Sequence, residues 1–121
     1  MNQTIKPVVW LGNTYEELTK FPSEVQGVMG YALYQAQIGN KHPDAKPLKG
    51  FKGAGVVEIV DNFDGDTYRT VYTVKLAGIV YVLHVFQKKS KKGIATPPKD
   101  IELIKKRLKK ANERHKNLYH D

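Results

Sequence analysis

The first third of the chain alternates a short apolar run with residues at helical spacing. Residues 7–11 form an apolar run closed by Gly12 and Asn13, which predicts a strand followed by a turn. Residues 14–20 predict a short helix, because Glu16 and Glu17 suit a first helical turn. Residues 23–38 predict a longer helix that ends at the Gly-Asn pair after them. Its apolar positions are Val25, Val28, Met29, Ala32 and Ala36.

The middle of the chain changes from helical spacing to a β pattern. Residues 41–55 contain prolines, glycines and lysines without consistent periodicity, which predicts a surface loop. Residues 56–60, 68–76 and 79–87 are rich in β-branched and aromatic side chains and predict three strands. The first turn is expected across residues 61–66 and the second across residues 77–78. Together they predict an antiparallel meander.

The last segment returns to helical spacing. Thr96 and Pro97 are typical of an N-cap and a first helical position. An apolar stripe follows, on a helix that is cationic elsewhere: Ile101, Ile104, Leu108 and Ala111. The order β-α-α-β-β-β-α predicts one α+β domain over residues 1–121, with a helical hairpin on one face of a small sheet. Residues 112–121 are expected to form a tail prone to fraying.

The net charge of +8 is concentrated behind the last predicted strand. Residues 1–87 contain 8 Lys or Arg and 8 Asp or Glu, whereas residues 88–116 contain 12 and 3. Such a cationic segment indicates an anionic partner, and nucleic acid is the abundant one. The chain has no cysteine, which excludes disulfides and thiolate sites, and no apolar run of membrane-spanning length. We therefore expect a cytoplasmic protein.

Several motifs in a fixed order identify a family resemblance. They are Phe-Pro-Ser-Glu at 21–24, Gly-Tyr-Ala-Leu at 30–33, Lys-Pro-Leu-Lys-Gly at 46–50, Tyr-Arg-Thr-Val-Tyr at 68–72 and a strand ending in Phe-Gln-Lys-Lys at 86–89. With this combination the chain resembles toxins of bacterial type II toxin–antitoxin systems, the RelE/ParE superfamily, over roughly residues 8–111. The Phe-Gln-Lys-Lys ending is similar to the HigB-like, phage-derived branch.

The resemblance implies a RelE-like fold and a small toxin inhibited by a cognate helix-turn-helix antitoxin. Most RelE-like and HigB-like members cut mRNA on the ribosome and need no metal or cofactor, which implies an endoribonuclease with mRNA and rRNA as partners. ParE-like members share the fold and instead inhibit DNA gyrase. A binding module that is not toxic and acts with its antitoxin is the third alternative, since fold alone does not determine function. Charge complementarity predicts an antitoxin segment that is acidic or both acidic and apolar.

The resemblance also implies catalytic cations. Arg69 occupies the arginine of the Tyr-Arg-x-x-Tyr strand, which contacts the scissile phosphate in the family, and a guanidinium matches two phosphate oxygens. The alternative is an ion pair with Asp66 or Glu58. Lys88 and Lys89 correspond to a basic pair at the end of the last strand and are expected to stabilise the transition state.

Further residues are candidates for binding RNA or moving a proton. Lys91, Lys92 and Lys49 are expected to contact phosphates, and Phe86 is a candidate for stacking on a base. His84 is a candidate acid or base, although strict alternation places it with Val80, Val82 and Phe86 and favours a structural role.

Two family features are missing from the sequence. Val57 and Val60 stand where relatives often carry arginines, and Ala95 lies near a position that is often tyrosine or histidine. The sequence therefore identifies neither a general base nor a general acid, and it contains no metal-binding or phosphate-loop motif.

Overall fold

The computed structural model describes residues 4–88 and 95–119 and shows an α+β architecture, as the sequence predicts. The chain order is β-α-α-β-β-β-β-α. The elements are β1 (Val8–Trp10), α1 (Thr14–Thr19), α2 (Ser23–Gln37), β2 (Lys46–Pro47), β3 (Val56–Phe63), β4 (Asp66–Thr73), β5 (Val80–Lys88) and α3 (Pro98–Tyr119).

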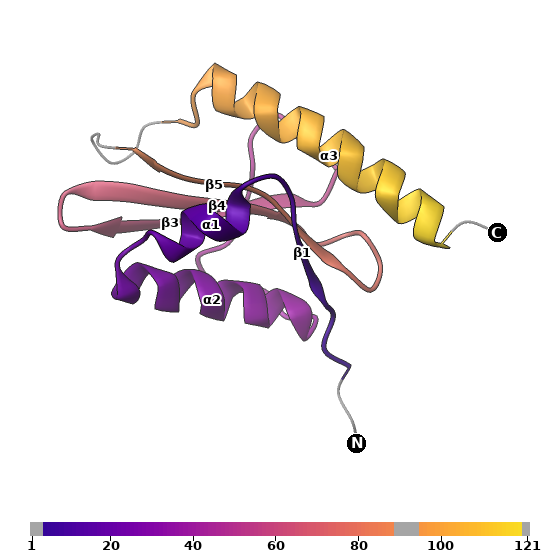
Figure 1. Ribbon diagram of the computed structural model, residues 1–121, viewed down its shortest axis with the longest axis horizontal. Helices are drawn as coiled ribbons and strands as arrows, with labels where there is room; N and C mark the ends of the chain where they lie inside the picture. Colours follow the sequence, from indigo (N-terminus) through magenta and orange to yellow (C-terminus); the bar gives the residue numbers. More distant parts are fainter. Residues whose placement is uncertain (1–3, 89–94, 120–121) are drawn as a thin grey trace.

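The strands form one five-stranded sheet in the order β1-β5-β4-β3-β2. Strand β1 runs parallel to β5, and the other neighbours are antiparallel. Helices α1 and α2 lie on one face of the sheet and α3 lies on the other (Figure 1). This arrangement confirms the predicted helical hairpin on one face, with the basic helix on the opposite face.

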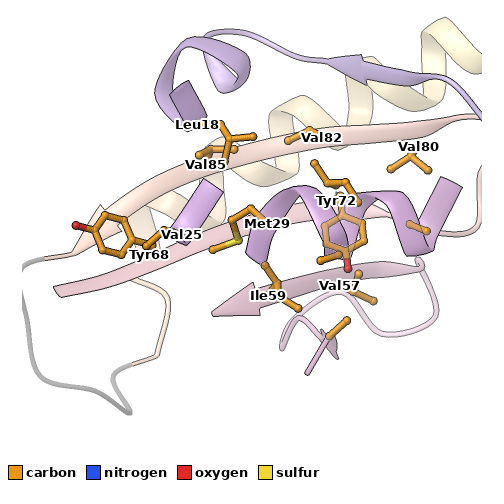
Figure 2. Packing of buried hydrophobic residues seen from close by; sticks show 14 of the residues in the cluster. Leu18, Val25, Met29, Val57, Ile59, Tyr68, Tyr72, Val80, Val82 and Val85 are labelled. Carbon is orange, nitrogen blue, oxygen red and sulfur yellow. The ribbon is translucent and has the colours of Figure 1, made fainter. Parts of the chain in front are cut away.

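The core between the sheet and the helical hairpin consists of side chains at the predicted spacings. Val25 and Met29 of α2 meet Val57 and Ile59 of β3, and Tyr72 lies beside them (Figure 2). These side chains share one face because alternate residues of a strand point the same way, while residues three or four apart share a helix face.

Helix α3 covers the other face through a narrow apolar stripe. Ile104 and Ala111 are fully buried against Val71, Tyr81 and Leu83 of the sheet. Residues 112–119, expected to fray, continue α3 as helix. Within the described ranges, no helix has the length and the apolar composition to cross a membrane.

The turns differ from the sequence-based expectation. The β3–β4 connection is a two-residue turn at Asp64 and Gly65, both with positive φ, rather than the whole stretch 61–66. The β4–β5 connection is longer than predicted and spans residues 74–79. The short strand β2 lies inside the predicted loop of residues 41–55 and pairs with Val57 and Glu58 of β3. The expected element order therefore lacked one strand.

An extra residue in β5 changes which side chains share a face. Val71 pairs with His84 but the next residue, Tyr72, pairs with Val82, so Leu83 is an additional residue in β5. Val82 consequently faces the helical hairpin, whereas Phe86 belongs to the α3 side. The expectation that His84, Val82 and Phe86 share one face was wrong, because a β-bulge interrupts the alternation.

Arg107 of α3 binds the backbone at this bulge. Its Nη1 donates to the Leu83 carbonyl oxygen at 2.9 Å, and its Nη2 donates to Asn13 Oδ1 at 3.3 Å. Gly12 leaves room for the guanidinium, because a Cβ at this position would lie 2.5 Å from Nη2. One side chain therefore connects α3, the bulge and the β1–α1 turn.

Replacing Arg107 with Met is expected to lower the free energy of unfolding by about 2 kcal/mol, because the bulge carbonyl loses a charged hydrogen-bond donor while the apolar stem is kept. Urea denaturation measures the change. The matched control is Lys106→Met on the exposed side of α3, which is expected to change stability by less than about 0.5 kcal/mol. Equal stability of the two variants would contradict a role for Arg107 at the bulge.

Candidate functional site

The candidate site lies on the α3 side of the sheet, where β3, β4 and β5 run beside each other. The register places Arg69 of β4 between Val60 of β3 and Phe86 of β5. Lys88 follows at the end of β5, opposite Thr67. The pairing of β4 with β5 thus brings Arg69, Phe86 and Lys88 into one region.

Arg69 contacts a carboxylate and a hydroxyl. Its Nη1 lies 3.4 Å from both Oε1 and Oε2 of Glu58 and 3.4 Å from Thr96 Oγ1. Thr96 Oγ1 also donates to Glu58 Oε2 at 3.4 Å. The arginine is buried, with 6% exposure. These contacts are longer than the roughly 2.7–2.9 Å of strong charge-assisted hydrogen bonds, so the ion pair is loose.

Lys88 forms a second ion pair in the same region. Its Nζ lies 3.7 Å from Asp100 Oδ2, and a third of the lysine side chain, 33%, is exposed. Asp100 belongs to the first turn of α3, where a carboxylate also interacts favourably with the helix dipole. The start of α3 is thereby fixed to the end of β5, with the ammonium of Lys88 partly open to solvent.

His84 connects to the same carboxylate. Its Nε2 lies 2.8 Å from Asp100 Oδ1, and its Nδ1 lies 3.4 Å from Arg107 Nη1. A neutral imidazole with the proton on Nε2 satisfies both contacts, since it donates to Asp100 and accepts from Arg107. Burial lowers the pKa of His84 below its ordinary value, although the hydrogen bond to Asp100 opposes the shift. Both ring nitrogens therefore already have partners.

The other predicted site residues are placed differently. Phe86 is only 8% exposed and stacks on His84, with ring centroids 4.4 Å apart, so little of its ring is available to a base. Lys49 is exposed in the loop after β2 and makes none of the contacts described for Arg69 or Lys88. Lys89, Lys91 and Lys92 lie outside the described residues.

Two polar residues of the site were missed by sequence reasoning. Thr96 was predicted as the N-cap of the last helix, but α3 begins at Pro98 and the Thr96 hydroxyl instead joins Arg69 and Glu58. The sequence motifs assign no role to Asp100, yet its carboxylate contacts both His84 Nε2 and Lys88 Nζ. A signal for Asp100 was present, because an acidic residue in a first helical turn behind a cationic segment suggests an ion pair.

A small hollow of about 280 Å³ opens beside Glu58. Its lining also includes Val60, Asn62, Lys46 and Asp44. Lys46 pairs across the strands with Glu58, so a cation and a carboxylate border the hollow together. Val60 places an aliphatic side chain at a position where the resemblance implies an arginine.

The part of the chain that the structure describes contains no group of three or more His, Cys, Asp or Glu side chains arranged to hold a metal ion.

The sequence matches a known protein family over most of its length. Residues 16–109 match the family of phage-derived proteins like Gp49. The chain belongs to this family. The match confirms the phage-derived, RelE/HigB-type toxin family that the sequence motifs predict, and it spans α1 through most of α3. None of the curated proteins matches the sequence significantly.

Among solved structures, the chain is similar to the RelBE2 toxin–antitoxin complex from Mycobacterium tuberculosis. The identity is 18% and the TM-score 0.45, over 74% of this Gp49-like chain and 98% of the matched chain.

The lowered pKa of His84 predicts the direction of one pH effect. The unfolded chain binds a proton more tightly at this residue than the folded chain does, so stability is complete above the ordinary pKa of 6.5 and falls as the pH decreases below it. Urea denaturation at several pH values measures the slope. In His84→Gln this part of the slope is expected to disappear, whereas His42→Gln, a control in the loop, is expected to keep it. An unchanged slope in His84→Gln would contradict the assignment.

Proposed function

We propose that this Gp49-like protein is the toxin of a type II toxin–antitoxin system and an endoribonuclease that cuts mRNA on the ribosome without a metal. The observation that carries the proposal is the buried guanidinium of Arg69, whose ion pair with Glu58 is long, at 3.4 Å, and which also contacts Thr96. A buried cation with a long ion pair is suited to bind an incoming phosphate, because the phosphate oxygens can replace the carboxylate.

The proposed reaction is transfer of the phosphate to the neighbouring 2′-oxygen of the RNA. The 2′-hydroxyl loses its proton and its oxygen bonds to phosphorus, while the bond from phosphorus to the 5′-oxygen breaks and that oxygen takes a proton from solvent. Arg69 stabilises the negative charge that builds on the phosphate oxygens. Lys88, partly exposed at the end of β5, adds a second positive charge, and Lys89 remains a predicted contributor.

Glu58 is the candidate general base in this reaction. Its carboxylate contacts the arginine that would bind the phosphate, and it lines the hollow beside the site. A carboxylate in this position is able to accept the 2′-hydroxyl proton once the phosphate has occupied Arg69. His84 is a weaker candidate, because both of its ring nitrogens already contact Asp100 and Arg107.

The partners follow from charge. The exposed lysines of α3, together with Lys49 and the predicted contacts Lys91 and Lys92, are suited to bind rRNA and mRNA phosphates. The cognate helix-turn-helix antitoxin would neutralise this surface with an acidic segment, which raises its association rate and its specificity.

A second candidate function is inhibition of DNA gyrase without catalysis. It is favoured by the aliphatic Val60 beside Arg69 and by the low exposure of Phe86, because both reduce the groups available for RNA chemistry. A third candidate, a binding module that is not toxic, needs no catalytic group at all. Mapping transcript 5′ ends after induction identifies the nuclease, since only the nuclease produces new ends. DNA damage signalling then identifies the gyrase inhibitor, and unharmed growth identifies the module that is not toxic.

Arg69→Ala is expected to abolish growth arrest and transcript cleavage while leaving antitoxin binding intact, because the variant removes the cation that stabilises the phosphate. Transcript 5′-end mapping and co-purification with the antitoxin measure the two properties. Arg114→Ala, an exposed arginine near the end of α3, is the matched control and is expected to retain cleavage. Full cleavage by Arg69→Ala would overturn the assignment, and DNA damage signalling without cleavage by the native protein would favour the gyrase alternative.

Glu58→Gln distinguishes a base from a simple counter-ion. As a general base, Glu58 contributes roughly 10²–10⁴-fold to the rate, so the variant is expected to cleave at least 100-fold more slowly while binding RNA as tightly or more tightly. Single-turnover cleavage on programmed ribosomes measures the rate, and a filter assay measures binding. Undiminished cleavage with tighter binding would instead assign Glu58 the counter-ion role alone.

A further inference from the structure

A pocket of about 520 Å³ lies at the end of the sheet where β3 begins and β4 ends. It lies between the C-terminal end of α2, the loop around Phe51, and residues 72–75. Its volume falls within the roughly 300–1,000 Å³ of pockets that bind ligands. Glu58 and Thr96, which contact Arg69, and Asp100, which contacts Lys88, do not line it.

The floor of the pocket is apolar. Its aliphatic and aromatic lining includes Leu48, Phe51, Val57, Tyr72 and Val74. Val74 is 42% exposed, which is high for a valine that follows directly after a strand. An apolar hollow that reaches solvent through an exposed valine is suited to receive a large apolar side chain.

The rim of the pocket is cationic. Three lysines line it, Lys41, Lys52 and Lys75, and no Asp or Glu does. Lys75 is held in position, because its Nζ donates to the Gly53 carbonyl oxygen at 3.2 Å and its stem packs over Gly55. This charge distribution favours a ligand that combines an apolar group with flanking carboxylates.

Tyr72 provides a polar group at the floor. The residue is only 1% exposed, and burial raises the pKa of its hydroxyl to about 12, so the hydroxyl stays protonated. Figure 2 shows this hydroxyl directed towards Val57, which also lines the pocket. Among the described residues the hydroxyl makes no hydrogen bond, and it is not one of the polar atoms sealed from solvent, so it stays accessible to a ligand. A bound ligand can supply the missing partner.

We propose that this pocket docks an acidic segment of the antitoxin, with one large apolar side chain on the floor and carboxylates against Lys41, Lys52 and Lys75. The identity of the partner rests on the proposed toxin function, whereas the chemistry of the segment rests on the pocket alone. RNA fits less well, because a phosphate backbone would leave the apolar floor without a contact.

The pocket and the candidate catalytic site use different residues: Glu58, Arg69, Thr96, Lys88 and Asp100 do not line the pocket, although Leu48, Phe51 and Val56 of its lining belong to the core on the α3 side. Val57 and Tyr72 belong to the core on the helical-hairpin side, whereas the neighbouring Glu58 and Arg69 contact Thr96 on the α3 side. Mutations in the pocket are therefore expected to weaken partner binding without changing the groups proposed for catalysis.

The direct test uses a synthetic peptide with one tryptophan flanked by Asp and Glu, and a matched peptide with serine in place of tryptophan. Amide NMR spectra of the full chain report binding by residue. The tryptophan peptide is expected to shift signals around the pocket and to saturate below about 1 mM, whereas the serine peptide binds at least tenfold more weakly. No saturable shift, shifts confined to α3, or displacement by a short oligoribonucleotide would each overturn the proposal.

Two surface variants locate the site without disturbing the core. Val74→Asp and Lys52→Glu change exposed residues of the pocket and are each expected to weaken peptide binding at least tenfold. Leu118→Asp and Lys116→Glu make the same changes on the exposed end of α3 and are expected to bind as the native chain does. Equal weakening in both pairs would mean general charge repulsion and would overturn the proposal.

A growth experiment in cells tests the identity of the partner. If the chain arrests growth, the Val74→Asp, Lys52→Glu double variant is expected to remain toxic but to escape neutralisation by the antitoxin from the adjacent reading frame. Neutralisation of this double variant at the native level would overturn the antitoxin as occupant. Failure of the native chain to arrest growth would count against the toxin function, and the peptide measurements would still decide the chemistry of the pocket.

Discussion

The single additional residue in β5 is the constraint on which the α3 side of the molecule depends. Without it, alternation would leave His84 on the same side as Val82, in the core under the helical hairpin. With it, His84 reaches Asp100, and Asp100 in turn reaches Lys88. Arg107 stabilises this local irregularity by binding the Leu83 carbonyl, so the position of the α3 N-terminus and the placement of Lys88 have a common origin.

The charges of the candidate site differ from the other charges of the chain in their burial. Arg69 and Lys88 each face a carboxylate, Glu58 and Asp100, but only Arg69 is largely withdrawn from solvent, since a third of the Lys88 side chain, 33%, is exposed. A buried cation such as Arg69 interacts strongly with a bound phosphate, because little water competes for it. The lysines along α3 are exposed and screened by salt, so they suit attraction over a distance rather than stabilisation of a reacting group.

The two proposed activities use different side chains of the same strands. Adjacent residues of a strand point to opposite faces, so β3 and β4 each contribute to both sites. Glu58 and Arg69 serve the α3 side, while Val57 and Tyr72 line the pocket. A small chain is thereby able to bind a partner protein at one place and present a cationic cluster at another, with no shared side chain.

The sequence by itself determined most of the secondary structure, the α+β class and the family, because these depend on local periodicity and on motifs of neighbouring residues. It also predicts that Arg69 and Lys88 lie in one region, because two consecutive strands joined by a short connection pair in antiparallel fashion. The roles of Thr96 and Asp100 were decided only by tertiary structure, because their partners are 12 to 38 residues away along the chain. The face of His84 depended on a bulge that no local pattern announces, and the pocket exists only where three distant segments meet.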